Sequence, residues 1–283
     1  MATPQPLNSL DMTHAGLHAT HSFLAINEYG ETVEQHVSSE RPLTLYIDKR
    51  EIVTLMTLGT QPEALILGYI RNQGFIDNIN QIKSIQVDWE TESAAVTTWH
   101  GIENISDKLK KRTVTTGCGQ GTVFGDMMEK LEQIKLPQIP LKQSRLYELL
   151  HNLSQDNAIY KSAGAVHGCA LCEDTSRLYF IEDVGRHNAV DAIAGLMWLD
   201  NINGDHKIFY TTGRLTSEMV MKVAQMGISV LLSRSGITEM GLSLAQQLGI
   251  TLIARAKGRH FQVFNGAENI VFDAIPKKRM ENV

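Results

Sequence analysis

The chain has 283 residues, of which 43% are apolar and 20% are charged, as is ordinary for a globular protein with a sizeable core. At roughly 150 residues per domain, this length predicts about two domains or one large one. The 26 basic and 31 acidic residues give a net charge of −5, which argues against a general nucleic-acid binder but leaves room for a local anion site.

The cysteines and the apolar segments indicate the compartment. Three cysteines are too few for a disulfide framework, and an odd count in a chain of this length favours a reducing compartment. The first 40 residues contain no Lys or Arg, so we expect no cationic signal or transit peptide. No apolar stretch approaches the ~20 residues of a transmembrane helix. We therefore expect a cytoplasmic protein that does not bind membranes.

Residues 1–40 are predicted to form a polar lead-in, because they show no sustained hydrophobic period. His14, His18 and His21 have helical spacing within it, which would permit a metal site. Isolated histidines in a frayed terminus are the favoured interpretation.

Residues 41–140 are predicted to form a small α+β domain. The polar residues 48–50 separate two β-like runs, which is typical of a hairpin, and Pro62 suits the first turn of a helix that Gly74 ends. The predicted elements are strands at 43–47, 51–58, 84–89 and 94–99 and a helix over 62–74.

This domain ends in a loop around Cys118 that we expect to be mobile. Three glycines fall within residues 117–121, a composition unsuited to a packed helix or a central strand. The basic residues 108–112 lie just upstream, and nearby cations lower the pKa of a thiol. Cys118 therefore suits carrying a sulfur atom or attacking an electrophile, and a merely exposed cysteine is the open alternative.

Residues 141–283 repeat a strand–turn–helix rhythm after a first helix at about 144–153. Short strands that alternate with helices of 10–12 residues indicate βαβ units and a largely parallel sheet. The predicted strands are 177–181, 207–210, 228–232 and 250–254, and the helices that follow the first three are 188–199, 217–226 and 238–249.

Basic residues and glycine follow each of these four strands. In open α/β sheets, ligands bind beyond the carboxyl ends of the strands, where helix N-termini attract anions. Any one such loop is ordinary, but four at one sheet edge favour a ligand with phosphate groups. No Walker A loop is present, and no G-x-G-x-x-G follows a strand. The basic residues are Arg186, Arg214, Arg234, Arg255, Lys257 and Arg259.

Cys169, Cys172 and His167 have a spacing that suggests zinc. The segment 163–172 reads as a strand, however, and a spacing of three residues puts the two sulfurs on opposite faces. Buried thiols that behave as small apolar residues are therefore favoured over a metal site. His187 and Asp191 lie one helical turn apart, where a structural or a catalytic hydrogen bond is equally compatible with the spacing.

Four stretches are similar to those of the FdhD/NarQ family, and the resemblance runs from about Arg41 to Phe264. Two of their motifs, E-D-V-G-R-H-N and G-R-L-T-S-E-M, are specific. The four stretches are A-V-H at 165–167, E-D-V-G-R-H-N-A-V-D at 182–191, T-G-R-L-T-S-E-M at 212–219 and S-R-S at 233–235. The resemblance implies a cytoplasmic sulfurtransferase that serves formate dehydrogenase. It also implies a homodimer and a C-terminal α/β/α domain similar in fold to cytidine deaminases, without their zinc.

In that family a cysteine desulfurase loads a persulfide onto a loop cysteine. The sulfur then passes to molybdenum in a bound substrate, the bis-(molybdopterin guanine dinucleotide) cofactor, which a guanine nucleotide can mimic. The family cysteine maps onto Cys118, and a cofactor-contacting segment maps without gaps onto Arg255, Ala256, Lys257, Gly258, Arg259 and His260. With Arg186, His187, Arg214 and Arg234, these are the predicted cofactor-binding residues.

The chain departs from the family pattern at several positions. Gly121 stands where the loop usually has a second cysteine, and Ile237 replaces a common proline. Ala254 and Arg255 replace Gly and Phe, and Lys257 replaces Arg. Gly121 keeps open a second hypothesis, a chaperone that delivers the cofactor without transferring sulfur. A zinc deaminase is a third, although the H-x-E and P-C-x-x-C pattern that it needs is absent.

Overall fold

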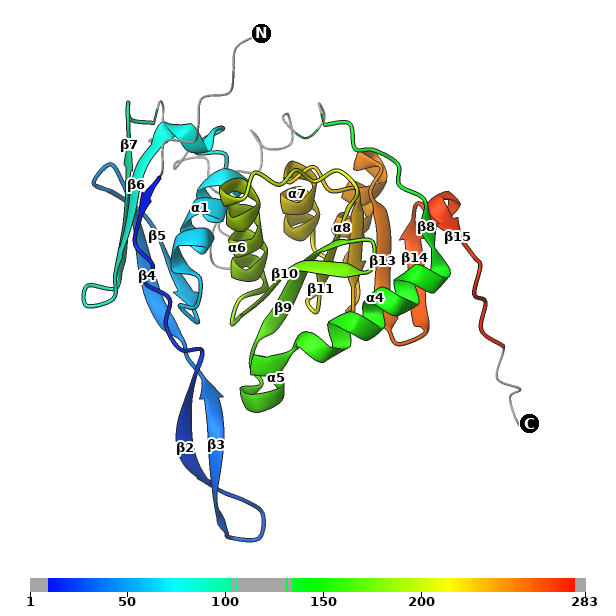
Figure 1. Cartoon of the computed structure of the whole chain (residues 1–283), viewed down its shortest axis with the longest axis horizontal. Coiled ribbons are helices and arrows are strands. Elements are labelled where there is room, and N and C mark those ends of the chain that lie inside the picture. Colours follow the sequence, from blue (N-terminus) through cyan, green and yellow to red (C-terminus); the bar gives the residue numbers. More distant parts are fainter. Residues whose placement is uncertain (1–9, 103–104, 106–130, 132–133, 278–283) are drawn as a thin grey trace. The chain divides into compact units, whose positions relative to one another are not determined.

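The computed structural model describes residues 10–102, 105, 131 and 134–277 (Figure 1). Cys118, Gly121 and the basic residues 108–112 lie outside these ranges. The chain divides into two compact units. Unit 1 comprises Met1–Gln133, Ala158–Gly168 and Ile181–Asn203, and unit 2 comprises Ile134–Asn157, Cys169–Phe180 and Gly204–Val283. The predicted boundary between residues 140 and 141 stays a prediction.

Unit 1 contains a five-stranded sheet in the order β1-β6-β7-β4-β5. The predicted hairpin is present, because β4 and β5 pair antiparallel. Asp48 and Lys49 form its two-residue turn with φ values of 46° and 69°, the left-handed conformation that matches the twist of paired strands. The strands are β1 (Asp11–Met12), β4 (Arg41–Ile47), β5 (Arg50–Thr57), β6 (Ile82–Asp88) and β7 (Ser93–Thr98).

Two helices of unit 1, α1 (Pro62–Asn72) and α6 (Arg186–Leu199), pack against each other through glycines. A Cβ added to Gly68 would lie 1.6 Å from the carbonyl oxygen of Asp191, and one added to Gly195 would lie 2.0 Å from that of Ala64. The backbones therefore touch where no side chain fits. The sheet, both helices and the short helix η1 (Ile79–Gln81) enclose one apolar core, which includes Leu45, Ile66, Tyr69, Ile70, Ile85 and Ala192.

The N-terminal segment differs from the predicted lead-in without regular structure. Strands β2 (Thr20–Ile26) and β3 (Thr32–Ser38) form an antiparallel ribbon. His21 lies in β2, so the helical spacing of the N-terminal histidines has no structural meaning. The short helix α5 (Ala158–Ala163), which the sequence did not indicate, packs against β3.

Unit 2 is built on a six-stranded sheet in the order β10-β9-β11-β12-β13-β14. The prediction of a largely parallel sheet was wrong. Only β11, β12 and β13 are parallel neighbours, whereas β9 and β14 are antiparallel to the strands beside them. The strands are β9 (His167–Glu173), β10 (Ser176–Asp183), β11 (Lys207–Thr211), β12 (Val230–Ser233), β13 (Thr251–Lys257) and β14 (His260–Asn265).

Helices α4 (Gln143–Asp156), α7 (Ser217–Gln225) and α8 (Glu239–Leu248) belong to unit 2. The predicted ends of α8 are confirmed. Thr238 Oγ1 accepts a hydrogen bond from Gly241 N at 3.2 Å, and Gly249 ends the helix with a φ of 68°. Two short strands, β8 (Leu141–Lys142) and β15 (Ile270–Val271), pair in parallel, and η2 (Ala267–Asn269) precedes the second.

The mixed α/β architecture predicted from the sequence is confirmed. The similarity to cytidine deaminases stays a prediction. In the described residues, no helix is long and apolar enough to cross a bilayer.

Candidate functional site

The loops that follow β11 and β12 are tied together at one edge of the unit 2 sheet. The strands end in register, with Thr211 opposite Ser233. Arg234 N donates to Thr211 O at 3.0 Å, and Ser233 Oγ donates to Gly213 O at 2.7 Å. These bonds hold the loops of Arg214 and Arg234 side by side.

The same edge continues into the helices through a second set of backbone bonds. Leu215 N donates to Gly236 O, and Thr238 N donates to Leu215 O, each at 3.0 Å. Leu215 and Ile237 thus form a short parallel bridge just before α7 and α8 begin. Because the two loops brace each other, the backbone beneath the arginines is preorganised.

Arg255 joins this edge from β13. Its N–H donates to Ser235 O at 2.9 Å, beside Arg234. The ladder to β14 is irregular between Ala254 and Lys257, and Arg255 has a φ of 53°, a left-handed conformation that is uncommon for a residue with a Cβ. Such local strain persists where the surrounding structure imposes it, often at functional sites.

Arg214, Arg234 and Arg255 are exposed. Burial raises the pKa of Tyr210 to about 12, while the charge of Arg234 acts in the opposite direction. The Tyr210 hydroxyl therefore stays protonated at neutral pH, and this edge presents fixed positive charge to an anion.

The segment from Arg255 to His260 is a β-hairpin, whereas the sequence predicted a strand that ended at 254 and then a loop. Lys257 pairs with His260 across the turn at Gly258 and Arg259. Ala256 differs from its neighbours because its side chain is buried in the apolar core of unit 2. The other five residues of the segment are exposed.

The E-D-V-G-R-H-N motif builds a buried polar network in unit 1. The Asp183 carboxylate accepts hydrogen bonds from Thr57 Oγ1 at 2.6 Å, Leu58 N at 3.1 Å and Gly185 N at 3.1 Å. Burial raises the pKa of Asp183, and these hydrogen bonds oppose the rise. Asn188 Nδ2 donates both to Asp183 Oδ1 at 2.7 Å and to Met56 O at 2.6 Å. The motif therefore fastens the end of β5 to the start of α6.

Glu182 has a separate structural contact in the same unit. Its carboxylate accepts from Ile159 N and Tyr160 N, both at 2.9 Å, at the start of α5. Glu182, Asp183 and Asn188 were not predicted from the sequence to be framework residues. Two acidic residues at the end of an apolar strand were the signal that could have suggested it.

Comparison with known proteins covers nearly the whole chain. The family model for the FdhD/NarQ family matches residues 38–271. The chain belongs to this family.

Two relatives are named sulfur carrier protein FdhD. The one from Listeria innocua is 30% identical, with 85% of this chain and 93% of the relative covered. The one from Bacillus subtilis is also 30% identical, with 86% of this chain and 94% of the relative covered. A crystal structure assigned as a formate dehydrogenase accessory protein from Desulfotalea psychrophila is similar in fold. Its TM-score is 0.71 at 28% identity, with 89% of this chain and 98% of that chain covered.

The remaining predicted residues of this FdhD/NarQ chain occupy different settings. Arg186 and His187 begin α6 in unit 1, where Arg186 is partly buried and His187 is 4% exposed. The Asp191 carboxylate accepts from Asn72 Nδ2 at 2.7 Å. The predicted catalytic Cys118 lies outside the described residues.

Cys169 and Cys172 are both fully buried, as predicted for thiols that pack as small apolar residues. Cys169 Sγ donates to Thr211 Oγ1 at 3.2 Å, and burial raises the pKa of Cys172 to about 12. Among the described residues, no cluster of three or more His, Cys, Asp or Glu could hold a metal ion.

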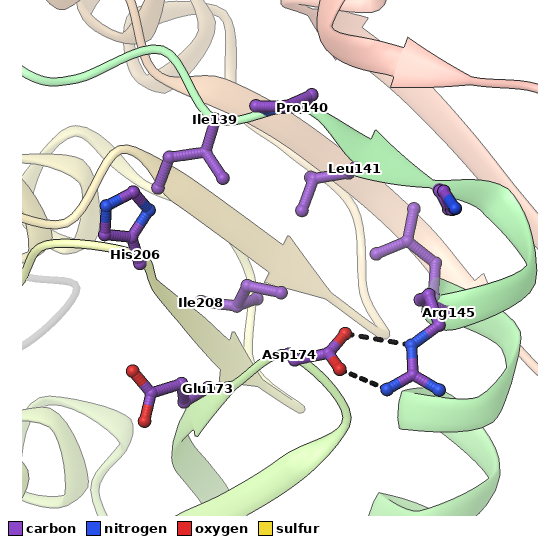
Figure 2. Close-up of a pocket in the computed structure, with 10 residues that line it drawn as sticks. Ile139, Pro140, Leu141, Arg145, Glu173, Asp174, His206 and Ile208 are labelled. Atoms are coloured by element: carbon purple, nitrogen blue, oxygen red, sulfur yellow. Dashed lines mark hydrogen bonds and ion pairs between the residues drawn. The ribbon is translucent and has the colours of Figure 1, made fainter.

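A separate cavity of about 420 Å³ lies near the amino end of β11 in unit 2 (Figure 2). Ile139, Leu141 and Ile208 line its apolar side, and Arg145 donates two hydrogen bonds to the Asp174 carboxylate at its mouth. None of the predicted site residues that the structure describes lines this cavity.

Proposed function

We propose that this chain is a sulfur carrier required for formate dehydrogenase activity, acting through Cys118. The observation that carries the proposal is the nearly full-length match to curated sulfur carriers of the FdhD/NarQ family. The name of the similar crystal structure supports the link to formate dehydrogenase.

The proposed chemistry begins at a cysteine desulfurase that carries a persulfide. The Cys118 thiolate attacks the terminal sulfur of that persulfide, the donor's S–S bond breaks, and the desulfurase leaves as a thiolate. The terminal sulfur then passes from Cys118 to molybdenum in the bis-(molybdopterin guanine dinucleotide) substrate: the persulfide S–S bond breaks, Cys118 leaves as a thiolate, and the two electrons that reduce the transferred sulfur to sulfide come from Mo(IV), which becomes Mo(VI). A single cysteine suffices for this route, so Gly121 in place of a second cysteine does not prevent it.

The edge of the unit 2 sheet that carries Arg214, Arg234 and Arg255, here called the arginine edge, supports the proposed substrate. A cofactor with two pyrophosphates needs several guanidinium and N–H donors, since charged hydrogen bonds to phosphate are strong. Arg214, Arg234 and Arg255 are exposed on loops that the hydrogen bonds above hold together. The residues from Lys257 to His260 complete the proposed set in unit 2, and Ala256 can contribute only its backbone because its side chain is buried. Arg186 and His187 of unit 1 remain sequence-based candidates, and His187 is only 4% exposed.

The proposal extends to the setting of the protein. We propose that it acts in the cytoplasm as a homodimer with a cysteine desulfurase and formate dehydrogenase as its partners. We also propose that its C-terminal domain has the cytidine-deaminase fold without zinc. The residue two beyond His167 is Cys169, and Gly168 precedes Cys169, so neither half of the deaminase zinc motif is present.

Intact-mass spectrometry after incubation with a cysteine desulfurase and cysteine tests the proposal. We expect an adduct of one sulfur atom that reduction removes, that is absent from Cys118→Ser and that persists in Cys172→Ala, whose thiol is buried. A second readout is formate dehydrogenase activity in cells that express each variant.

The alternative is a chaperone that binds the cofactor and delivers it without sulfur transfer, and Gly121 is the residue that favours it. Full support of formate dehydrogenase by Cys118→Ser, or no adduct with a competent desulfurase, would establish the chaperone in place of the carrier.

A further inference from the structure

The ribbon of β2 and β3 is separate from the five-stranded sheet of unit 1. Within the described residues, these two strands pair only with each other (Figure 1). They extend from unit 1 away from its five-stranded sheet, and α5 packs against the β3 side. An isolated two-stranded ribbon is at best marginally stable in water, so this one is expected to be covered by something else.

Both ends of the ribbon are nevertheless well formed. At the tip, Asn27 Oδ1 accepts from Tyr29 N at 3.0 Å and from Glu31 N at 2.9 Å. At the base, Ser39 N donates to Ala19 O and Ser38 Oγ donates to Gly164 O, both at 2.8 Å. Specific bonds thus fix the ribbon as an element with a defined register.

Large apolar side chains are exposed on both faces of β2. Phe23 is 58% exposed on one face, and Leu24 and Ile26 are 77% and 68% exposed on the other. Val37 lies on the Phe23 face and is 48% exposed. Large exposed apolar side chains gathered on one short ribbon are typical of an interaction site.

The two long edges of the ribbon differ in protection. The β3 edge carries Glu34, and α5 packs against that strand. The β2 edge, T-H-S-F-L-A-I, has no proline, no acidic residue, no Lys or Arg, and no bulge in its pairing. Native proteins usually block a free edge with such features, so the bare β2 edge is suited to accepting another strand.

We propose that this strand is β2 of a second copy of the chain, paired antiparallel so that two ribbons form one four-stranded sheet. The inference rests on the proposed function in that it names the surface of the proposed homodimer. A strand that pairs with its own copy about a two-fold axis meets its own sequence in reverse. No like charges meet in β2, and full overlap of its seven residues places the axis at Phe23.

The hydrogen-bond pattern of the ribbon agrees with this register. Ser39 N donates to Ala19 O, and Asn27 N donates to Glu31 O, so every second residue between positions 19 and 27 faces β3. The residues between them, including Ser22 and Leu24, direct their N–H and C=O groups to the free edge. With the axis at Phe23, Ser22 lies opposite Leu24 of the partner subunit as a hydrogen-bonded pair.

Proline substitution tests the edge, because proline removes one outward N–H. Ser22→Pro removes it from the β2 edge, whereas His36→Pro, opposite it in the ribbon, removes the equivalent donor from the β3 edge. By analytical ultracentrifugation we expect a wild-type dimer at micromolar concentration. Ser22→Pro should raise its dissociation constant at least tenfold, and His36→Pro should leave it unchanged within about threefold. Circular dichroism and thermal unfolding verify that both variants fold.

A cross-link tests the register and does not depend on a proline. In a Cys118→Ser background, Phe23→Cys places two thiols opposite each other at a non-hydrogen-bonded pair, a spacing that a disulfide spans. Oxidation should give a covalent dimer, and Gln35→Cys, which lies opposite Phe23 on β3, should not.

The outcomes separate the interface from the function. A dimer that survives Ser22→Pro and gives no Phe23→Cys cross-link overturns the β2 edge but leaves the homodimer intact. Equal loss in Ser22→Pro and His36→Pro also overturns the β2 edge. A monomeric wild-type chain overturns both the β2 interface and the homodimer. Binding of the ribbon to formate dehydrogenase or a desulfurase by a monomeric chain would be one form of this outcome.

Discussion

The strand-to-helix connection after β10 in unit 1 differs from those after β11 and β12 in unit 2, although all three are short and contain glycine. After β10, Asp183 and Asn188 are buried and bonded to one another and to the end of β5. After β11 and β12, the backbones bond to each other while Arg214 and Arg234 remain exposed. The polar side chains beside the connection after β10 support the fold. The arginines in the connections after β11 and β12 are available to a ligand.

This difference teaches that a family motif mixes two kinds of residue. Buried polar networks contribute strongly to stability when satisfied and cost much when one partner is lost. Exposed arginines contribute little to stability, but they can dominate anion binding. We therefore expect substitutions in unit 1 to act on unfolding and substitutions at the arginine edge to act on affinity.

The largest effect is expected where the helix backbones of unit 1 touch. Gly68→Ala should destabilise by about 3 kcal/mol, because its new Cβ would lie 1.6 Å from Asp191 O and force α1 and α6 apart. Gly236→Ala in unit 2, where nothing lies within 4 Å of the added Cβ, should change stability by less than about 0.5 kcal/mol. Thermal and denaturant unfolding measure both, and equal stability of the two variants would contradict the close helix contact.

At the arginine edge, Arg214→Gln and Arg234→Gln should each weaken guanine-nucleotide binding by about 1–3 kcal/mol, or roughly 5- to 150-fold, as a charged hydrogen bond is lost. Both variants should keep the wild-type melting temperature. Arg177→Gln, an exposed arginine of β10 that donates to Asp156 Oδ1 at 2.6 Å, is the control with unchanged affinity. Unchanged calorimetric affinity in both edge variants would remove the edge from the proposed substrate site.

Asp183→Asn should destabilise unit 1 by about 2 kcal/mol, since its amide would place N–H donors among Thr57, Leu58 and Gly185, which already donate there. It should also change the pH dependence. Burial raises the folded-state pKa of Asp183 above the unfolded value of about 3.9. Its stabilising contribution is thus full below about pH 3.9 and is lost as pH rises through the folded pKa.

Urea unfolding of wild type and Asp183→Asn between about pH 4 and pH 8 measures this effect, and the wild-type advantage should shrink as pH rises. Asp273→Asn in unit 2 is the control, and its difference from wild type should stay constant over this pH range. Hydrogen bonds from Ser144 lower the pKa of Asp273, so its contribution is present above about pH 3.9 and is lost as pH falls. Parallel pH profiles for wild type and Asp183→Asn would show that Asp183 does not titrate abnormally.

The smallest effect concerns two threonines that precede helices at the arginine edge. Thr238→Ala should cost about 1 kcal/mol, because Thr238 Oγ1 caps α8 through Gly241 N. Thr216 precedes α7 without a side-chain cap, so Thr216→Ala should be nearly neutral. Melting temperatures that fall equally in both variants would show that the hydrogen bond from Gly241 N to the Thr238 hydroxyl does not contribute to stability.

The rhythm of strands and helices beyond residue 141 could be predicted because apolar residues follow the period of each element there. Strand direction could not, since no local pattern in β9 or β14 reveals that each is antiparallel to its neighbour in the sheet. The β2–β3 ribbon was missed for a different reason. With both faces exposed, β2 lacks the alternation that a half-buried strand shows.

The candidate site divides in the same way. Arginines that follow apolar strands pointed to the sheet edge, and the structure brings Arg214, Arg234 and Arg255 together through backbone bonds. Mapping a continuous segment onto residues 255–260 included Ala256, whose side chain the pleat of β13 turns into the core. Sequence reasoning finds loops well, but it does not distinguish side chains that face a ligand from those that support the fold.

The burial of Cys169 and Cys172 has a practical consequence for thiol chemistry on the native protein. Alkylating reagents and sulfur donors need an accessible thiolate, and a pKa of about 12 leaves Cys172 protonated at any working pH. Cys169 is equally shielded and donates its thiol hydrogen to Thr211. Because the chain has three cysteines, any label acquired without unfolding reports on Cys118 alone. Because the two buried thiols do not react in the folded protein, a single sulfur atom bound at Cys118 can be quantified without removing them.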